Sequence, residues 1–170
     1  MAIHDATPIE QRVISVLVEN KSGVLSHVVG LFSARGFNID SLAVGETEDA
    51  TMSRITLVAK GDQKTLEQIK KQLNKLIDVI KVQDLTEEEC VDRELMLVKI
   101  KNTPESKKAL TELSSKYHLL VIDENAKMTT LECTETRENT KKLFEIFQKI
   151  GIVEMAQTGT VALSKKAPKD

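Results

Sequence analysis

Apolar residues follow two different spacings near the start of the chain. Residues 13–18 (V-I-S-V-L-V) form a short apolar, β-branched run of the kind found in buried strands. Residues 23–34 instead space their apolar side chains three or four positions apart, as on one face of a helix, at Val24, Leu25, Val28, Leu31 and Phe32. The polar residues 19–22 separate the two segments, and Gly36 follows the second as a helix stop. The pattern predicts a strand that leads through a tight turn into the N-terminus of a helix.

The rest of the first half completes a known order of elements. Residues 38–46 and 52–59 alternate around a turn at 47–50, which predicts a β-hairpin. Asp62 is a candidate N-cap for a helix over residues 63–75, and residues 79–85 form a last strand. The order β-α-β-β-α-β is that of the ferredoxin-like unit, which carries both helices on one face of its sheet.

The second half repeats this order. Its predicted elements are a strand at 94–101, a helix at 105–117 with Pro104 in its first turn, a hairpin at 118–124 and 127–133, a helix at 136–149, and a last strand from 152–156 with 161–163. Such self-similarity indicates a duplicated unit. We therefore predict an α+β fold with two ferredoxin-like βαββαβ domains in tandem, at residues 12–85 and 93–164. A leader (1–11), a linker (86–92) and a tail (165–170) complete the chain.

The two copies differ at the turn between their first strand and first helix. The first copy has N-K-S-G at residues 20–23, and the second has K-N-T-P at 101–104, where Pro104 lacks a backbone donor. The free N–H groups and the dipole at a helix N-terminus favour an anion such as a carboxylate. Gly23 allows close approach of a ligand to the backbone, and Ser22 is a plausible N-cap. We therefore expect a ligand on the first copy only.

Asn38 lies at the other end of the same helix, and its amide oxygen can accept a hydrogen bond from an ammonium group. A helix N-terminus and an amide oxygen together suit the two charged ends of an amino acid. The helix separates them by roughly 20 Å, so one subunit cannot offer both to one small ligand. Two subunits that lie side by side in antiparallel fashion can offer both groups to one ligand. The alternative is that Ser22 and Gly23 are only a cap and a turn, and Asn38 only a helix-stop residue.

Composition and charge exclude several classes of protein. The net charge of −2 is spread over both halves, and no apolar run reaches the roughly 18 residues of a membrane span. The N-terminus has no basic and apolar signal pattern, and Cys90 and Cys133 form no close pair, so we expect a cytoplasmic protein. Aromatic residues are only 3% of the chain, which argues against the RNA binding that some ferredoxin-like folds perform.

Motifs for catalysis or metal binding are missing from the sequence. It has no Gly-rich phosphate loop, and the three histidines (His4, His27 and His118) share no metal-ligand spacing. The acidic run at residues 87–89 fits a solvated linker. We therefore expect no catalytic residues, no metal site and no enzymatic activity in this chain.

One long run carries a family resemblance. Residues 12–42, R-V-I-S-V-L-V-E-N-K-S-G-V-L-S-H-V-V-G-L-F-S-A-R-G-F-N-I-D-S-L, resemble the amino-acid-binding ACT domain. They resemble more closely the small regulatory subunits of acetohydroxyacid synthase (acetolactate synthase). The resemblance continues through T-M-S-R-I-T-L-V at 51–58 and R-E-L-M-L-V-K-I at 93–100 to G-T-V-A-L-S at 159–164, and is looser between 101 and 149.

The resemblance implies a ligand, a partner and a set of site residues. The ligand is a branched-chain amino acid, usually valine, held between two ACT domains across a two-fold axis of a homodimer. The implied effector-binding residues are Asn20, Gly23, Val24 and Leu25 of one subunit with Asn38 and Ile39 of the other. The partner is the large catalytic subunit, which holds thiamine diphosphate, magnesium and FAD and joins two 2-oxo acids. This chain is expected to hold none of these cofactors. Residues 41–48 are a first guess for the docking surface.

The resemblance also implies the function. The chain would activate the catalytic subunit and confer feedback inhibition by valine or another branched-chain amino acid. The alternative is a free-standing amino-acid sensor that acts on gene expression or on another enzyme. A small enzyme in its own right is a third reading, which the missing catalytic motifs argue against.

Overall fold

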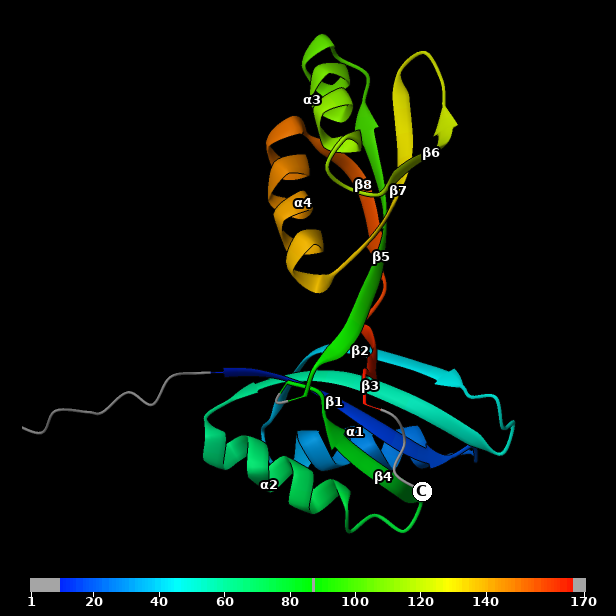
Figure 1. Cartoon of the computed structure of the whole chain (residues 1–170), viewed down its shortest axis with the longest axis vertical. Coiled ribbons are helices and arrows are strands. Elements are labelled where there is room, and N and C mark those ends of the chain that lie inside the picture. Colours follow the sequence, from blue (N-terminus) through cyan, green and yellow to red (C-terminus); the bar gives the residue numbers. More distant parts are fainter. Residues whose placement is uncertain (1–9, 87, 167–170) are drawn as a thin grey trace, which may run out of the picture. The chain divides into compact units, whose positions relative to one another are not determined.

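Two units, each with its own sheet and core, make up the chain in the computed structural model (Figure 1). The structure describes residues 10–86 and 88–166. Among the described residues, the first unit comprises 10–86, 88–91 and 162–166. The second unit is formed by residues 92–161.

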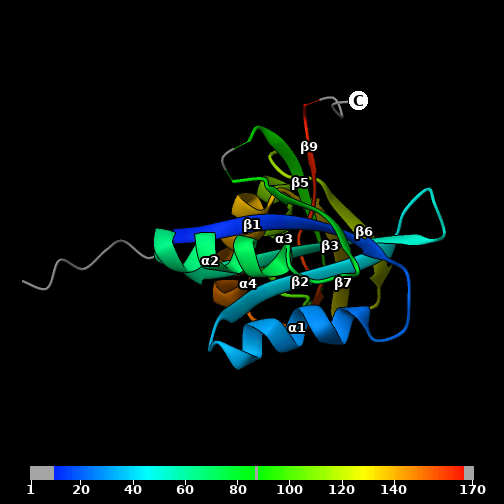
Figure 2. The same cartoon turned by 90° about the horizontal axis from the view of Figure 1, so that it is seen from below.

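The first unit has a four-stranded antiparallel sheet in the order β2-β3-β1-β4. Its elements are β1 (Glu10–Glu19), α1 (Val24–Ala34), β2 (Asn38–Glu46), β3 (Met52–Gly61), α2 (Gln63–Leu73) and β4 (Val79–Asp84). Both helices lie across one face of the sheet (Figures 1 and 2). The alternation along β1 sends Ile14, Val16 and Val18 into the core beneath them. Asp62 caps α2 as predicted, because its Oδ1 accepts a hydrogen bond from the Thr65 N–H at 2.6 Å.

The second unit repeats this arrangement with β6-β7-β5-β8 as the strand order, and β9 also pairs with β5. Its elements are β5 (Cys90–Lys101), α3 (Pro104–Ser114), β6 (Leu119–Glu124), β7 (Met128–Glu135), α4 (Arg137–Ile150) and β8 (Ile152–Gln157). The strand β9 (Val161–Ser164) joins the sheet through β5, and its residues 162–164 group with the first unit. Met96, Val98 and Ile100 of β5 form a separate core with Leu143 and Phe147 of α4. The predicted fold of two βαββαβ units is therefore confirmed.

The boundaries of the elements differ from the prediction in three places. The sheet begins inside the predicted leader, at Glu10, whereas residues 1–9 lie outside the described part. The predicted linker at 86–92 is too long, because β5 already begins at Cys90. The predicted last strand is two strands, β8 and β9, of which residues 162–164 group with the first unit.

Side-chain hydrogen bonds explain the break between β8 and β9. The Leu95 N–H donates to Thr158 Oγ1 at 3.0 Å, and the Thr160 hydroxyl bonds Glu94 Oε1 at 2.5 Å. The Thr158 hydroxyl oxygen thus takes the place of a ladder carbonyl, whereas the Thr160 hydroxyl donates to the Glu94 side chain. Among the described residues, no helix is long and apolar enough to span a bilayer.

Candidate functional site

The corner between β1 and α1 is built on Gly23. This residue is the N-cap of α1, and its φ of 89° lies in the left-handed region that favours glycine. No side chain caps the helix here, so the prediction of Ser22 as the cap is wrong. The left-handed turn at Gly23 redirects the chain by itself, and the Ser22 side chain is left on the surface.

The first turn of α1 keeps backbone donors open. The first regular helical hydrogen bond runs from the His27 N–H to the Gly23 carbonyl at 3.0 Å. Within the described part of the chain, no hydrogen bond takes up the N–H groups of Leu25 and Ser26. The first turn also carries no acidic side chain. Open donors at the positive end of a helix dipole form a site that favours a carboxylate.

The equivalent corner in the second unit is closed. Thr103 Oγ1 accepts from the Ser106 N–H at 3.1 Å, and Ser106 Oγ accepts from the Thr103 N–H at 2.9 Å. Pro104 has no N–H to offer, as predicted, and Glu105 adds a negative charge to the first turn. An anion would therefore find neither free donors nor a favourable charge at α3.

Asn20 ties the α1 corner to the turn between β2 and β3. Its Nδ2 donates to the Ala50 carbonyl at 2.9 Å and to Glu46 Oε2 at 3.3 Å. Its backbone N–H donates to the Thr51 carbonyl at 2.7 Å. Figure 2 shows the α1 N-terminus and this hairpin turn at the same end of the first unit. Asn20 thus supports the corner, and its amide nitrogen is already engaged.

Val24 and Leu25 present different groups at the corner. The Val24 side chain is buried in the core, so only its backbone faces the turn. The Leu25 side chain is 39% exposed and offers an apolar surface next to the open donors. Asn20, Gly23, Val24 and Leu25 therefore lie together at this corner.

Asn38 and Ile39 lie at the opposite end of α1. The helix ends at Ala34, a left-handed Gly36 turns the chain, and β2 begins at Asn38. The 11 residues of α1 span about 16 Å at 1.5 Å per residue. One chain therefore does not bring Asn38 and Ile39 to the Gly23 turn.

Asn38 is held by Asp40, a residue that the sequence analysis missed. The Asn38 Nδ2 donates to Asp40 Oδ1 at 2.8 Å, and no hydrogen bond in the described residues engages the Asn38 amide oxygen. Asp40 also bonds Gln11 and pairs with Lys60 at 3.0 Å. Burial opposes ionisation of Asp40, but the hydrogen bonds from Gln11, Lys60 and Asn38 outweigh it and lower its pKa. An acidic residue two positions after Asn38 was the sequence signal that could have indicated this contact. The β2–β3 register shifts between Ile39 and Ser41, so strand alternation alone does not predict the direction of the Asp40 side chain.

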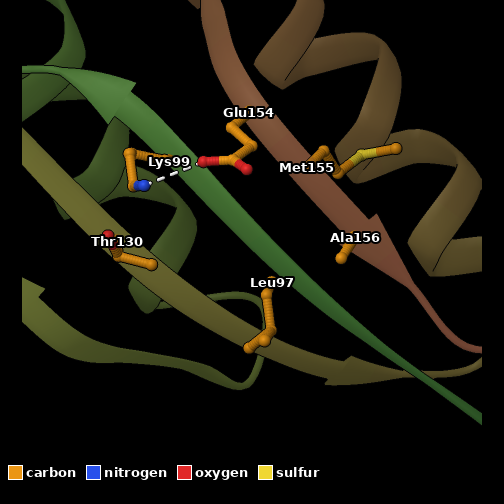
Figure 3. A pocket seen from close by; sticks show the side chains of 6 residues that line it. All are labelled: Leu97, Lys99, Thr130, Glu154, Met155 and Ala156. Atoms are coloured by element: carbon orange, nitrogen blue, oxygen red, sulfur yellow. Dashed lines mark hydrogen bonds and ion pairs between the residues drawn. The ribbon is translucent and has the colours of Figure 1, made fainter.

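A hollow of about 200 Å³ lies on the helix-free face of the second sheet (Figure 3). It is lined by Leu97, Lys99, Thr130, Glu154, Met155 and Ala156. Lys99 Nζ and Glu154 Oε2 lie 2.9 Å apart, so the two charges of the hollow satisfy each other. The lining offers no open charge to orient a ligand.

Metal binding and thiol chemistry find no support in the described residues. No three side chains of His, Cys, Asp or Glu within residues 10–86 and 88–166 are placed to hold a metal ion. His27 pairs with Asp78 at 3.2 Å, and His4 lies outside the described part. Burial, with the nearby carboxylates of Glu132 and Glu135, raises the pKa of the Cys133 thiol to about 12. That thiol stays protonated and weakly nucleophilic at neutral pH.

Comparison with known proteins identifies the family. Residues 14–81 match the model of the AHAS small subunit-like ACT domain, and residues 93–166 match the small subunit of acetolactate synthase. The acetolactate synthase small subunit of Mycolicibacterium smegmatis is 45% identical over 152 residues, which cover 89% of each chain. The chain belongs to the family of acetolactate synthase small subunits. The Buchnera aphidicola small subunit is 40% identical over 92% of this chain and 99% of its own.

A solved small subunit also shares the fold over nearly the full length. The crystal structure of the acetolactate synthase small subunit from Thermotoga maritima has a TM-score of 0.80 and 36% identity, and covers 94% of this chain and 99% of that chain. The family resemblance stated from the sequence is thus confirmed. All six predicted effector-binding residues fall inside the segment that matches the ACT model.

Proposed function

We propose that this chain is the regulatory subunit of acetolactate synthase and binds a branched-chain amino acid, valine first among them, at the α1 corner. The open N–H groups of Leu25 and Ser26 are the main support for this proposal. They lie at a helix start that no side chain caps, within the segment that matches the ACT model. The capped start of α3 supports the choice of the first unit over the second.

The geometry of α1 favours a site shared by two chains. The carboxylate of the amino acid would accept hydrogen bonds from the α1 N-terminus of one chain. Its ammonium group would donate to the amide oxygen of Asn38 in a second chain, with the Asp40 charge nearby. Two first units paired around a two-fold axis would bring these groups together, which makes the proposed regulatory subunit a homodimer.

Apolar contacts would then select the side chain of the ligand. Leu25 offers an exposed apolar surface beside the open donors, and Ile39 is half-buried beside Asn38. An apolar pocket distinguishes side chains that differ by one methylene by only ~1 to 3 kcal/mol. Valine, leucine and isoleucine should therefore compete for the site with affinities within about two orders of magnitude.

Regulation requires that the ligand prefer one state of the complex. In this proposal the partner is the catalytic large subunit, which carries the thiamine diphosphate, magnesium and FAD used to join two 2-oxo acids. Binding of valine to the small subunit can inhibit that enzyme only through different affinities for its active and inactive states.

A pair of substitutions at Gly23 tests the site. Gly23→Asp places a negative charge beside the open donors, whereas Gly23→Asn places a neutral side chain of the same shape there. Both variants carry the same backbone strain at a φ of 89°, so the pair differs mainly in charge. A Cβ at Gly23 meets no atom within 4 Å, so neither variant clashes. We expect calorimetry to show lost valine binding for Gly23→Asp and a clearly smaller loss for Gly23→Asn. Equal affinity in Gly23→Asp and the native chain would refute the site.

Reconstitution tests the function itself. The purified chain is mixed with the catalytic large subunit, and acetolactate formation is measured with and without valine. We expect higher activity with the small subunit present and inhibition by valine only in the mixture. If the chain neither associates with the large subunit nor changes its activity, the regulatory proposal fails, even if valine binds. That outcome would favour a free-standing amino-acid sensor.

A further inference from the structure

Asp40 lies at an irregular point of β2, next to Asn38. The pairing of β2 with β3 runs through Asn38 and Ile39, passes over Asp40 and resumes at Ser41. A bulge of this kind re-aims a side chain relative to the regular alternation of the strand. The Asp40 side chain is 14% exposed, and its Oδ1 lies 2.8 Å from the Asn38 Nδ2. The bulge therefore brings a shielded carboxylate against the amide of a proposed ligand-binding residue.

Two further donors hold the Asp40 carboxylate. Gln11 of β1 donates to its Oδ2, and the Nζ of Lys60 in β3 lies 3.0 Å from the same oxygen. Lys60 pairs with Gln11 on one side and with Asn38 on the other, so the three donors come from neighbouring positions of three strands. Burial opposes ionisation of Asp40, but the hydrogen bonds from these donors outweigh it and lower its pKa. Asp40 is therefore an ionised carboxylate at neutral pH, held in one place.

An ionised carboxylate determines which way the Asn38 amide faces. An asparagine side chain has a donating Nδ2 and an accepting Oδ1, which change places when the amide flips. Asp40 can only accept hydrogen bonds, so only the Nδ2 of Asn38 can lie against it. The Oδ1 is left at the other side of the amide, where no hydrogen bond from the described residues engages it. Asn38 thus offers an acceptor, which suits an ammonium group.

We propose that Asp40 is a positioning residue that makes the site selective for 2-amino acids over 2-oxo acids. In the proposed function, on which this rests, Asn38 of a second chain meets the ammonium group of valine. The 2-oxo analogue of valine, 3-methyl-2-oxobutanoate, has the same carboxylate and side chain but carries a ketone oxygen in place of the ammonium group. Both compounds suit the open donors of α1, so the carboxylate alone does not separate them.

The orientation of the Asn38 amide does separate them. A ketone oxygen only accepts hydrogen bonds, so it would face the Asn38 Oδ1 with neither group satisfied. A site whose polar groups are set for a donor rejects an analogue without that donor more strongly than an apolar pocket rejects a missing methylene. Such selectivity suits a regulator whose proposed partner uses 2-oxo acids as substrates.

The substitution Asp40→Asn tests this role, because an amide can either donate or accept and so allows Asn38 to flip. Asp62→Asn is the matched control, since it removes a carboxylate of the same unit at the N-cap of α2, where asparagine caps equally well. Valine and 3-methyl-2-oxobutanoate are titrated into the full chain by calorimetry, alone and in competition. We expect valine to bind at least about tenfold more weakly to Asp40→Asn, while the 2-oxo acid binds no more weakly than to the native chain. Both affinities should stay native in Asp62→Asn.

Each other outcome for Asp40→Asn contradicts the proposal. An equal loss of both ligands would show that Asp40 only supports the fold, and an unchanged affinity for valine would show that it does not orient Asn38. The double variant Asn38→Asp with Asp40→Asn exchanges the two side chains and provides a second measurement if the single variant does not fold. A carboxylate accepts at both oxygens and needs no orientation. The exchange should therefore restore the preference for valine, and a preference below the native one would contradict the proposal.

The variant Gly23→Asp distinguishes a wrong role for Asp40 from a wrong site. If the native chain does not bind valine, or if Gly23→Asp binds it equally well, the proposed function fails and the role of Asp40 falls with it. If Gly23→Asp loses valine while Asp40→Asn keeps the native selectivity, the α1 corner remains the site and only the role of Asp40 is wrong.

Discussion

Gly23 gives α1 an open start because its left-handed backbone turns the chain without a capping side chain. Thr103 does the opposite in the second unit, where its hydroxyl and that of Ser106 satisfy two backbone donors. The two equivalent corners therefore differ: backbone donors are open at the start of α1 and satisfied at the start of α3. The difference lies in a few residues at the same point of two similar units.

This difference predicts unequal effects of two conservative substitutions. Thr103→Ala removes a capping hydroxyl and should lower the free energy of unfolding by about 1 kcal/mol. Ser22→Ala should change it by less than about 0.5 kcal/mol, because Ser22 caps nothing. Urea denaturation of the two variants checks the prediction. A larger loss from Ser22→Ala than from Thr103→Ala would contradict the cap assignment.

Cys133 predicts a specific dependence of stability on pH. An unfolded thiol ionises near its ordinary pKa of 9.0, whereas the buried Cys133 ionises only near 12. As the pH rises between these values, the unfolded state loses this proton first, so the free energy of unfolding falls. Below pH 9 this contribution is complete.

The variant Cys133→Ala removes this titration and isolates it from that of other groups. We expect the stability difference between the native chain and Cys133→Ala to shrink from pH 8 to pH 10 in denaturation experiments. A difference that stays constant over this range would show that Cys133 titrates alike in both states.

The hairpin formed by β2 and β3 depends on a residue that lies outside it. Asn20 holds the turn through Ala50 and Glu46, although the sequence assigned it only to ligand binding. Asn20→Ala should therefore lower stability by about 1 kcal/mol, the net value of a typical hydrogen bond, even without ligand. Hydrogen exchange at residues 47–51 should accelerate, and exchange at the α3 end of the second unit serves as the control. Unchanged exchange in the hairpin would limit Asn20 to ligand contact.

Most elements were predictable because their apolar spacing matches the period of a strand or a helix. The duplicated order, the N-cap Asp62 and the proline start of α3 all follow from local patterns. The break between β8 and β9 depends instead on hydroxyls that meet β5 from more than 60 positions away. The support of Asn38 by Asp40, Gln11 and Lys60 likewise spans three strands. Single-sequence periodicity carries no information on such distant partners.

The candidate site was predictable only in part for a related reason. The glycine and the free helix start are local features, so the corner itself could be read from residues 20–25. The identity of the cap could not, because Ser22 and Gly23 are both plausible caps and only the backbone φ distinguishes them. Valine and the large subunit came from the family resemblance and not from the physics of the turn.

At the scale of the whole molecule, the open start of α1 and the capped start of α3 belong to two units with separate cores. Phe32 is a fully buried member of the first core, and Phe147 of the second. Replacing either with alanine removes a buried ring and should cost about 3 to 5 kcal/mol of stability in its own unit. If valine binds in the first unit alone, the two substitutions should have different consequences for the ligand.

We expect Phe147→Ala to accelerate hydrogen exchange in residues 92–161 while calorimetric valine binding stays within about threefold of the native value. Phe32 lies in the last turn of α1 and packs in the first core, so Phe32→Ala should accelerate exchange in residues 10–86 and weaken valine binding. Each variant is the matched control for the other, since both remove the same ring from a buried position. Loss of valine binding in Phe147→Ala with normal exchange in the first unit would mean that the second unit contributes to the site. If Phe147→Ala retains valine binding and Phe32→Ala loses it, the result would support a valine site formed only by residues that match the ACT model.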